Sequence, residues 1–254
     1  MDKFDEVRRK LVVARESLAG LRWQPGDAMD GLAQDWLALS DALKDAVFYG
    51  NPKNPNPDRS RFETESAAQS MQFAIDLLPS LRAVITRDYP RGDLVRLLDV
   101  GAGSGSGASL IAQLHASAML HARIDVEAID VVPWRSAWVA TQHPRVNYHV
   151  CDAEALPARN WDLVLCSHVI EHLEDPRAMI RHILRACRGH ALVYAPYRES
   201  PLSAGHVSII DEGTFANLGR PCEITILDSL GWAGEDRRCI LAVIDCRDGG
   251  EPCS

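Results

Sequence analysis

The glycine-rich run at residues 97–107 restricts the fold more than any other part of the sequence. It reads Leu-Leu-Asp-Val-Gly-Ala-Gly-Ser-Gly-Ser-Gly, an apolar strand that ends in alternating glycines and leads into an apolar helix. Glycines let the backbone turn sharply and let a ligand approach where any Cβ would clash. No Gly-Lys-Ser/Thr follows, which excludes a Walker phosphate loop. Gly103, Gly105 and Ala108 satisfy the permissive G-x-G-x-x-A dinucleotide pattern, so the run alone leaves the ligand open.

From Gly92 onward the chain alternates between short β-rich runs and helical stretches. This alternation is typical of parallel strands joined by right-handed helical crossovers, and it predicts a three-layer α/β sandwich. The last two strands are joined through residues 231–236, which leave no room for a crossover helix and predict an antiparallel pair. The expected strands are 94–100, 124–129, 146–150, 162–167, 190–194, 223–228 and 239–245. The expected helices are 106–115, 134–141, 176–187 and 212–218.

The first ninety residues are expected to be mainly helical, because their apolar residues recur close to every 3.6 positions. The expected helices cover residues 4–21, 31–49 and 65–86. Three prolines and three asparagines between Gly50 and Pro57 interrupt them. We therefore divide the chain into an N-terminal helical cap or lid, residues 1–91, and an α/β domain, residues 92–254, that carries the glycine-rich run. The apolar helix faces must pack on the core or on a second subunit, which allows a homodimer.

Composition excludes several classes of protein. Of the 254 residues, 46% are hydrophobic and 24% charged, which is typical of a globular chain rather than a disordered one. The formal net charge of −8 argues against a nucleic-acid-binding protein, because binding to phosphates usually requires a surplus of basic residues. No run approaches the roughly 20 apolar residues of a membrane helix, and no secretory signal is visible, so a cytoplasmic location is expected. The seven cysteines contain no Cys-x-x-Cys pair and predict neither a disulfide framework nor a zinc site.

Acidic and polar residues follow three further expected strands. Asp130 ends the second strand, where its carboxylate can accept hydrogen bonds from both hydroxyls of a ribose. Asp152 follows the third strand; its side chain can accept from an adenine amino group or merely cap the turn through Glu154. The segment Trp161–Pro176 spans the fourth strand and the loop after it. The carboxyl ends of parallel strands meet at one edge, so these segments predict a single crevice.

Together these segments resemble the class I S-adenosylmethionine-dependent methyltransferases, in the broad group of the ubiquinone and menaquinone type (type 11). The matching stretches are LLDVGAGSGSG, EAIDVVP, CDAEALP and WDLVLCSHVIEHLEDP, within residues 94–197. The resemblance implies a Rossmann-like sheet with strand order 3-2-1-4-5-7-6 and strand 7 antiparallel. It implies S-adenosyl-L-methionine as the cofactor and S-adenosyl-L-homocysteine as its product. The cofactor-binding residues that it implies are Asp99, Gly101, Ala102, Gly103, Gly105, Asp130, Val131, Asp152, Ala153 and Ser167.

The expected reaction is an in-line transfer of the activated methyl group to a small or medium-sized acceptor molecule, with O-methylation slightly favoured. If the acceptor is a hydroxyl, a base must remove its proton, and the candidates are His168, His172 and His206. The candidate acceptor contacts are Tyr49, Arg61, Tyr197 and Arg198. Two other functions remain open at this point. One is an NAD(P)-dependent oxidoreductase with the same nucleotide-binding half, and the other is a noncatalytic methyltransferase-like partner protein.

The segment His168–His172 also spells H-x-x-E-H, an inverted zinc-peptidase signature. It follows a buried strand and runs into Leu-Glu-Asp-Pro, so we expect it to straddle a loop and to hold no metal. The enzyme is accordingly expected to be metal-independent. The six remaining histidines are expected to be solvated: His115, His121, His143, His149, His182 and His190.

Overall fold

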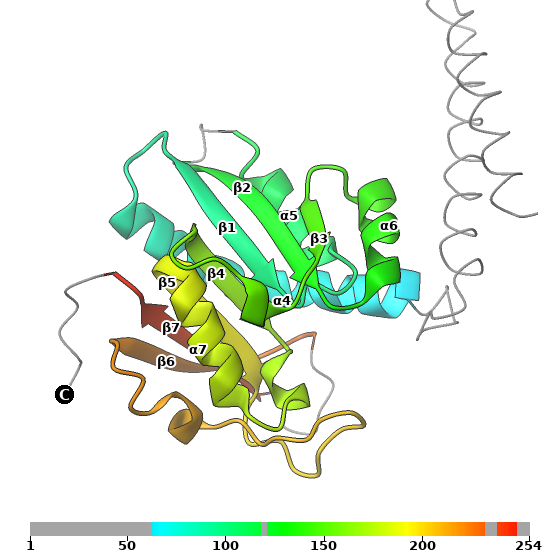
Figure 1. Ribbon diagram of the computed structural model, residues 1–254, viewed down its shortest axis with the longest axis vertical. Helices are drawn as coiled ribbons and strands as arrows, with labels where there is room; N and C mark the ends of the chain where they lie inside the picture. The colour runs from blue at the N-terminus through cyan, green and yellow to red at the C-terminus, as the bar shows by residue number, and fades with distance from the viewer. Residues whose placement is uncertain (1–61, 118–120, 232–237, 248–254) are drawn as a thin grey trace, which may run out of the picture.

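The computed structural model describes residues 62–117, 121–231 and 238–247. Among them, seven strands form one sheet in the order β3-β2-β1-β4-β5-β7-β6, as the family resemblance implies (Figure 1). Strand β7 is antiparallel to both of its neighbours, whereas the other pairs are parallel. The strands are β1 Leu94–Val100, β2 Arg123–Asp130, β3 Asn147–Val150, β4 Trp161–Ser167, β5 Cys187–Pro196, β6 Cys222–Asp228 and β7 Arg238–Asp245.

Within the described ranges, four α-helices and several short helical turns accompany the sheet. The α-helices are α4 Ala67–Asp88, α5 Ser106–Leu114, α6 Pro133–Gln142 and α7 Pro176–Ala186. A π-helical turn, η1 Phe62–Ser66, precedes α4, and 3₁₀ turns lie at η3 Ala153–Ala155, η4 Ile170–His172 and η5 Glu212–Phe215. The prediction of a helix over residues 212–218 is wrong after Phe215, where the 3₁₀ turn η5 ends. Asn217 and Gly219 both have positive φ angles, which a right-handed helix excludes.

The sheet separates two apolar layers, because successive side chains of a strand point to opposite faces. Leu97 of β1 belongs to the core with α4, α5 and α6, and its neighbour Leu98 belongs to the core with α7. Both leucines are completely buried. The predicted three-layer sandwich is therefore confirmed, with near-continuous apolar runs in the central strands.

Helix α4 is an integral part of the core, although it lies within the segment assigned to the N-terminal cap. Its inner face buries six apolar side chains in the same layer as α5. Two hydroxyl groups, those of Tyr194 on β5 and Ser229 after β6, donate hydrogen bonds to the Asp76 carboxylate of this helix at 3.0 and 2.6 Å. The expected helices before residue 62, and any cap or lid that they form, lie outside the described residues.

Two of the histidines expected to be solvated are buried, so that expectation is wrong for His115 and His190. His190 is 2% exposed, near the start of the apolar run of β5. Its Nε2 atom lies 3.6 Å from a carboxylate oxygen of Asp88 and 4.0 Å from one of Asp245. Burial lowers the pKa of both histidines.

No helix in the described ranges combines the length and the apolar character that a membrane span requires.

The role of α4 in the core predicts a large effect of shortening its inner side chains. Leu81 is fully buried, so Leu81→Ala should lower the free energy of unfolding by about 3 kcal/mol through lost burial and a cavity. Ile75 on the same helix is 45% exposed, and Ile75→Ala should cost about 0.5 kcal/mol or less. Urea denaturation of both variants measures the difference. Equal losses would show that α4 is not a core helix.

Candidate functional site

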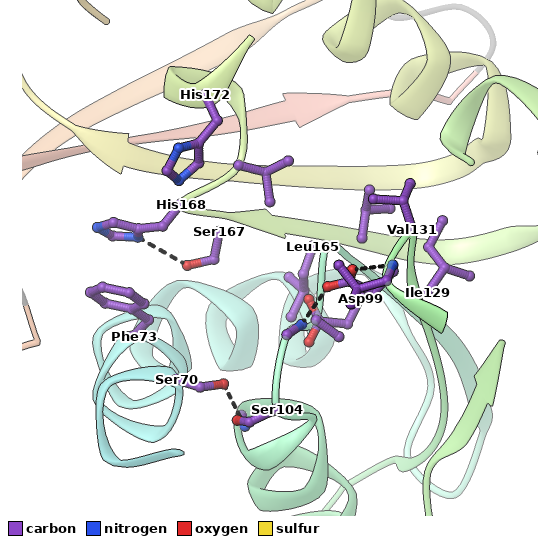
Figure 2. Close-up of a pocket in the computed structure, with 18 of the residues that line it drawn as sticks. Ser70, Phe73, Asp99, Ser104, Ile129, Val131, Leu165, Ser167, His168 and His172 are labelled. Carbon is purple, nitrogen blue, oxygen red and sulfur yellow. Dashed lines mark hydrogen bonds between the residues drawn. The ribbon is translucent and has the colours of Figure 1, made fainter. Parts of the chain in front are cut away.

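A cavity of about 830 Å³ opens at the carboxyl edge of the parallel strands (Figure 2). Its walls come from the ends of β1, β2 and β4, from the loops that follow them, and from one side of α4. This is the edge at which ligands bind in open α/β sheets. All the cofactor-binding residues that the sequence implies line this cavity except Gly105.

The glycine loop leaves β1 through backbone conformations that L-residues seldom adopt. Gly101 has a φ of +73°, and a Cβ there would lie 2.3 Å from a methyl group of Val169. Gly105 also has a φ of +73° and directly precedes α5, where a Cβ would lie 2.8 Å from a methyl group of Val139. The loop therefore turns without side chains and brings its backbone to the cavity wall. Gly105 lies after this turn, at the start of α5, and does not line the cavity.

Asp130 ends β2 inside the cavity and is 5% exposed. Its Oδ1 accepts a hydrogen bond from the Val132 amide at 2.9 Å, and its Oδ2 accepts one from the Gly103 amide at 3.0 Å. The guanidinium of Arg135 donates to Oδ2 at 2.5 Å. Asp130 thus links the glycine loop to α6. No signal in the sequence marks Arg135 as a site residue, because an arginine in the first turn of a helix is ordinarily a surface residue.

Asp99, at the end of β1, lies beside this acidic group and lines the same cavity (Figure 2). Burial raises its pKa to about 7, and the negative charge of Asp130 adds to the effect. The cavity thus has one acidic end at which a second negative charge is unfavourable, and a ligand that carries a positive group relieves that repulsion.

Asp152 and Ala153 lie at the side of the cavity formed by the end of β3. The Asp152 side chain accepts a hydrogen bond from the Glu154 amide at 2.9 Å and so caps η3. The capping role considered for this residue is confirmed, while its contact with an adenine amino group stays a prediction.

At the other end of the cavity, His168 follows Ser167 out of β4. Its imidazole stacks on the Phe73 ring of α4, with the ring centroids 3.5 Å apart and the planes 6° apart. Its Nδ1 atom lies 3.3 Å from the Ser167 hydroxyl oxygen, and its Nε2 atom lies 3.8 Å from the Cys239 sulfur. Burial holds the pKa of His168 well below its usual value. The sequence does not predict Phe73 as a site residue, because it belongs to an apolar helical stripe like any core residue.

His172 and His206 also line this end, and their rings meet edge to face with centroids 4.6 Å apart. His172 lies in η4 and His206 in the loop after β5, so the fold brings together two residues 34 positions apart. The three histidines proposed as bases therefore share one cavity. The H-x-x-E-H spacing does not assemble as a zinc site, since the His168 ring is directed to Phe73 and Cys239.

The residues predicted to contact the acceptor are not found in the cavity among the described part of the chain. Tyr197 and Arg198 do not line the cavity. The Tyr197 hydroxyl donates to one oxygen of Glu212 at 2.7 Å, and the Arg198 guanidinium donates to the other at 2.9 Å. Tyr49 and Arg61 lie outside the described residues. The contact of these four residues with an acceptor stays a prediction.

Comparison with known proteins agrees with this geometry. The family model described as a methyltransferase domain matches residues 40–219. The chain is 31% identical over 157 residues to the ubiquinone biosynthesis O-methyltransferase of Parvibaculum lavamentivorans, a match that covers 61% of this chain and 56% of the relative. The chain thus spans little more than half the length of that protein.

Solved structures show the same fold at low sequence identity. The citrinin polyketide synthase CMeT domain aligns with a TM-score of 0.58 at 13% identity, over 87% of this chain and 70% of that one. A phosphoethanolamine N-methyltransferase of Haemonchus contortus, solved with phosphomonomethylethanolamine and S-adenosylhomocysteine, aligns with a TM-score of 0.50 at 15% identity, over 76% of this chain and 59% of that one.

The proximity of the two carboxyls gives a prediction for the apoprotein. Asp130→Asn should lower the pKa of Asp99 from its value of about 7, because ionisation of Asp99 then meets no neighbouring negative charge. The pKa should stay above the ordinary 3.8, since burial remains. A carbon-13 NMR titration of the aspartate carboxyls measures it, with Asp125→Asn on the exposed side of β2 as the control. An unchanged or higher pKa in Asp130→Asn would contradict the coupling.

Proposed function

This chain belongs to the class I S-adenosylmethionine-dependent methyltransferases, and from that premise we propose that it methylates a hydroxyl group of a small or medium-sized acceptor. One observation carries the proposal: a single cavity joins the glycine loop and Asp130 at one end to three histidines at the other. Such a cavity can hold a methyl donor and an acceptor face to face. The similarity to an enzyme named as an O-methyltransferase supports oxygen as the target.

At the cofactor end, the residues of this chain would bind and orient S-adenosylmethionine. The Asp130 carboxylate is assigned to the ribose hydroxyls, and ionised Asp99 to the positively charged amino group of the methionyl part. Asp130 already accepts three hydrogen bonds, and a carboxylate offers about four acceptor positions. Binding of two hydroxyls therefore requires one present contact to yield. We assign that change to Arg135, whose side chain is partly exposed, rather than to the backbone amides.

At the acceptor end, the enzyme's task is alignment and proton removal. The carbon–sulfur bond of the sulfonium breaks as the carbon–oxygen bond forms, and the products are a methyl ether and S-adenosylhomocysteine. The hydroxyl proton leaves toward the side of the cavity that holds His172 and His206. Burial lowers the pKa of His168 well below its usual value, so its imidazole is a weak base. Its stacking on Phe73 instead forms a flat apolar wall.

Binding and transfer measured separately test this function. The full-length protein should bind S-adenosylmethionine and S-adenosylhomocysteine in titration calorimetry and should show no binding of NAD or NADP. It should transfer a tritiated methyl group to at least one member of a panel of phenols and other hydroxyl compounds. Binding of a nicotinamide dinucleotide would favour the oxidoreductase alternative. Cofactor binding with no transfer to oxygen, nitrogen or carbon acceptors would favour the noncatalytic alternative.

The assignment of Asp130 predicts a selective loss of affinity. Asp130→Ala removes charge-assisted hydrogen bonds of about 1.5–3 kcal/mol, so the dissociation constant of S-adenosylmethionine should rise by about tenfold or more. Asp125→Ala removes a carboxylate from the exposed part of the same strand and should leave the constant unchanged. Titration calorimetry on both variants, with thermal unfolding to confirm the fold, compares them. Equal affinity of Asp130→Ala and the unaltered protein would overturn the ribose assignment.

A further inference from the structure

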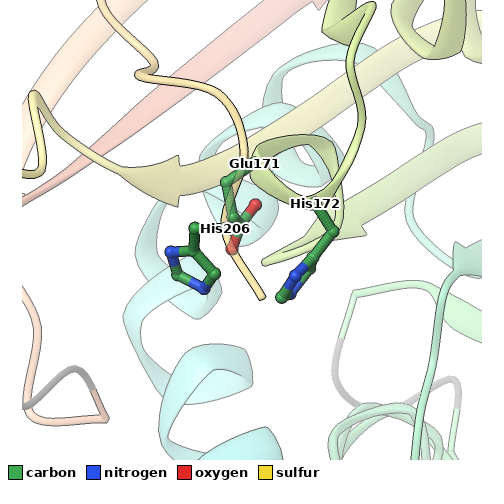
Figure 3. A group of neighbouring side chains, drawn as sticks. All are labelled: Glu171, His172 and His206. Atoms are coloured by element: carbon green, nitrogen blue, oxygen red, sulfur yellow. The ribbon is translucent and has the colours of Figure 1, made fainter. Parts of the chain in front are cut away.

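Glu171 is a buried carboxyl group that receives no hydrogen bond from any other described residue. The residue is 1% exposed, and within the described part of the chain neither carboxylate oxygen has a hydrogen-bond partner. It nevertheless lines the cavity, and its side chain extends between the imidazoles of His172 and His206 (Figure 3). Burial of a polar group without a partner costs free energy, so such a group in a functional cavity points to a missing ligand.

The three side chains lie close enough to share one ion. One ligand atom of each, from Glu171, His172 and His206, lies within 4.8 Å of the other two. A cation bound at about 2.0–2.2 Å from nitrogen and oxygen would hold such atoms about 3.4 Å apart in a tetrahedral site. A closing movement of about 1 Å at each side chain is therefore sufficient.

The hydrogen bonds of the two imidazoles set the tautomers that metal binding requires. Nδ1 of His172 lies 2.9 Å from the Gly205 carbonyl oxygen, and Nδ1 of His206 lies 2.5 Å from a carboxylate oxygen of Glu199. Both partners are acceptors, so each Nδ1 carries a proton, and in the neutral imidazole the lone pair lies on Nε2. Histidines that bind metals in proteins are held in this way, with the other nitrogen bonded to a carbonyl or a carboxylate.

The backbone holds the two halves of this cluster together. The carbonyl oxygen of Glu171 accepts hydrogen bonds from the amides of Val207 and Ser208, at 2.9 and 3.1 Å. In the same loop, the Ser203 amide donates to the second carboxylate oxygen of Glu199 at 2.9 Å. The side chains of Glu199 and His206 are 9% and 7% exposed, so their contact is shielded from water. The cluster is thus built by the fold rather than by a chance approach of surface residues.

We propose that Glu171, His172 and His206 bind a divalent transition-metal cation of the zinc type, with open coordination positions that face the cavity. Two imidazoles and one carboxylate suit such an ion, whereas magnesium and calcium prefer oxygen ligands alone. This proposal replaces the expectation of a metal-free enzyme. It also differs from the H-x-x-E-H pattern, since His206 takes the place of His168.

The use of the cation rests on the proposed function, whereas the metal site itself does not. With the cation bound, His172 and His206 act as its ligands and not as bases. An acceptor hydroxyl bound at an open position becomes more acidic, as a water bound to zinc does, and releases its proton to solvent water. Its oxygen can then attack the methyl group of S-adenosylmethionine bound in the same cavity. The positioning residue for this site is Glu199, which acts through His206.

Cobalt(II) is a suitable spectroscopic probe, because its d–d bands report nitrogen and oxygen ligands and a charge-transfer band would reveal thiolates. The full-length protein, stripped with EDTA and dialysed, should bind one equivalent of cobalt(II) with d–d bands and no thiolate band. Glu171→Gln and His206→Gln should each weaken cobalt(II) binding by at least tenfold. Glu199→Gln should weaken it by about 10–100-fold. Circular dichroism and S-adenosylmethionine binding should stay unchanged in all three variants, which separates loss of the site from loss of the fold.

Two further variants serve as controls for the ligand set. His149→Gln alters an exposed histidine on β3 and should leave cobalt(II) binding unchanged. His168→Gln should also retain it, because His168 faces Phe73 and Cys239. Failure of the unaltered protein to bind cobalt(II) would overturn the site, and a loss in His168→Gln as large as in His206→Gln would overturn its ligand set.

Chelation separates this inference from the proposed function. EDTA should abolish methyl transfer and leave S-adenosylmethionine binding intact, and zinc should restore the transfer. Full transfer in EDTA would overturn the role of the cation in the reaction. Failure to bind S-adenosylmethionine, with cobalt(II) still bound, would overturn the proposed function and leave the metal site standing.

Discussion

The cavity depends first on the left-handed backbone at the end of β1. Gly101, Gly103 and Gly105 all have positive φ angles, and they turn the chain between β1 and α5. Because no Cβ stands at these positions, Val169 and Val139 pack directly against the turn. The turn also directs the Gly103 amide to Asp130, so the conformation of the loop and the position of its acid are set together.

Charge is distributed unevenly along this cavity. At one end, burial raises the pKa of Asp99 to about 7, and the negative charge of Asp130 adds to the rise. Near the other end, burial raises the pKa of Glu171 to about 8, while it lowers that of His168. Burial thus favours the neutral form of all three groups. A cationic amino group at one end, and a cation at the other, would each favour the ionised form of the carboxyl beside it.

The sequence predicts the sheet well because its signal is local. The bounds of β1 agree residue for residue with the expected strand, and the other strands differ by a few positions, since apolar runs and turn residues lie next to each other in the chain. The buried state of His190 could not be predicted in this way. Its partners, Asp88 and Asp245, are 102 and 55 positions away, and only the pairing of β5 with β7 and the end of α4 bring them close. The predicted domain boundary between residues 91 and 92 places α4 outside the α/β domain. The apolar stripe of α4 indicates that one face is buried, but it does not indicate that this face packs on the sheet.

In the candidate site, too, the sequence does not predict contacts between residues that are far apart in the chain. Spacing along the chain groups His168 with Glu171 and His172, because H-x-x-E-H is a known metal pattern. In the fold, His168 has a φ of +53°, and this left-handed residue sends its ring to Phe73 while the next turn sends Glu171 inward. The place in the cluster is taken by His206, which no local motif connects with Glu171. Its position comes from two backbone amides bonded to the Glu171 carbonyl and from Glu199 at the far side of the loop. The chemistry at this end of the cavity is therefore decided by a loop 28 to 37 residues further along the chain, and comparisons of the H-x-x-E-H spacing alone would misassign it.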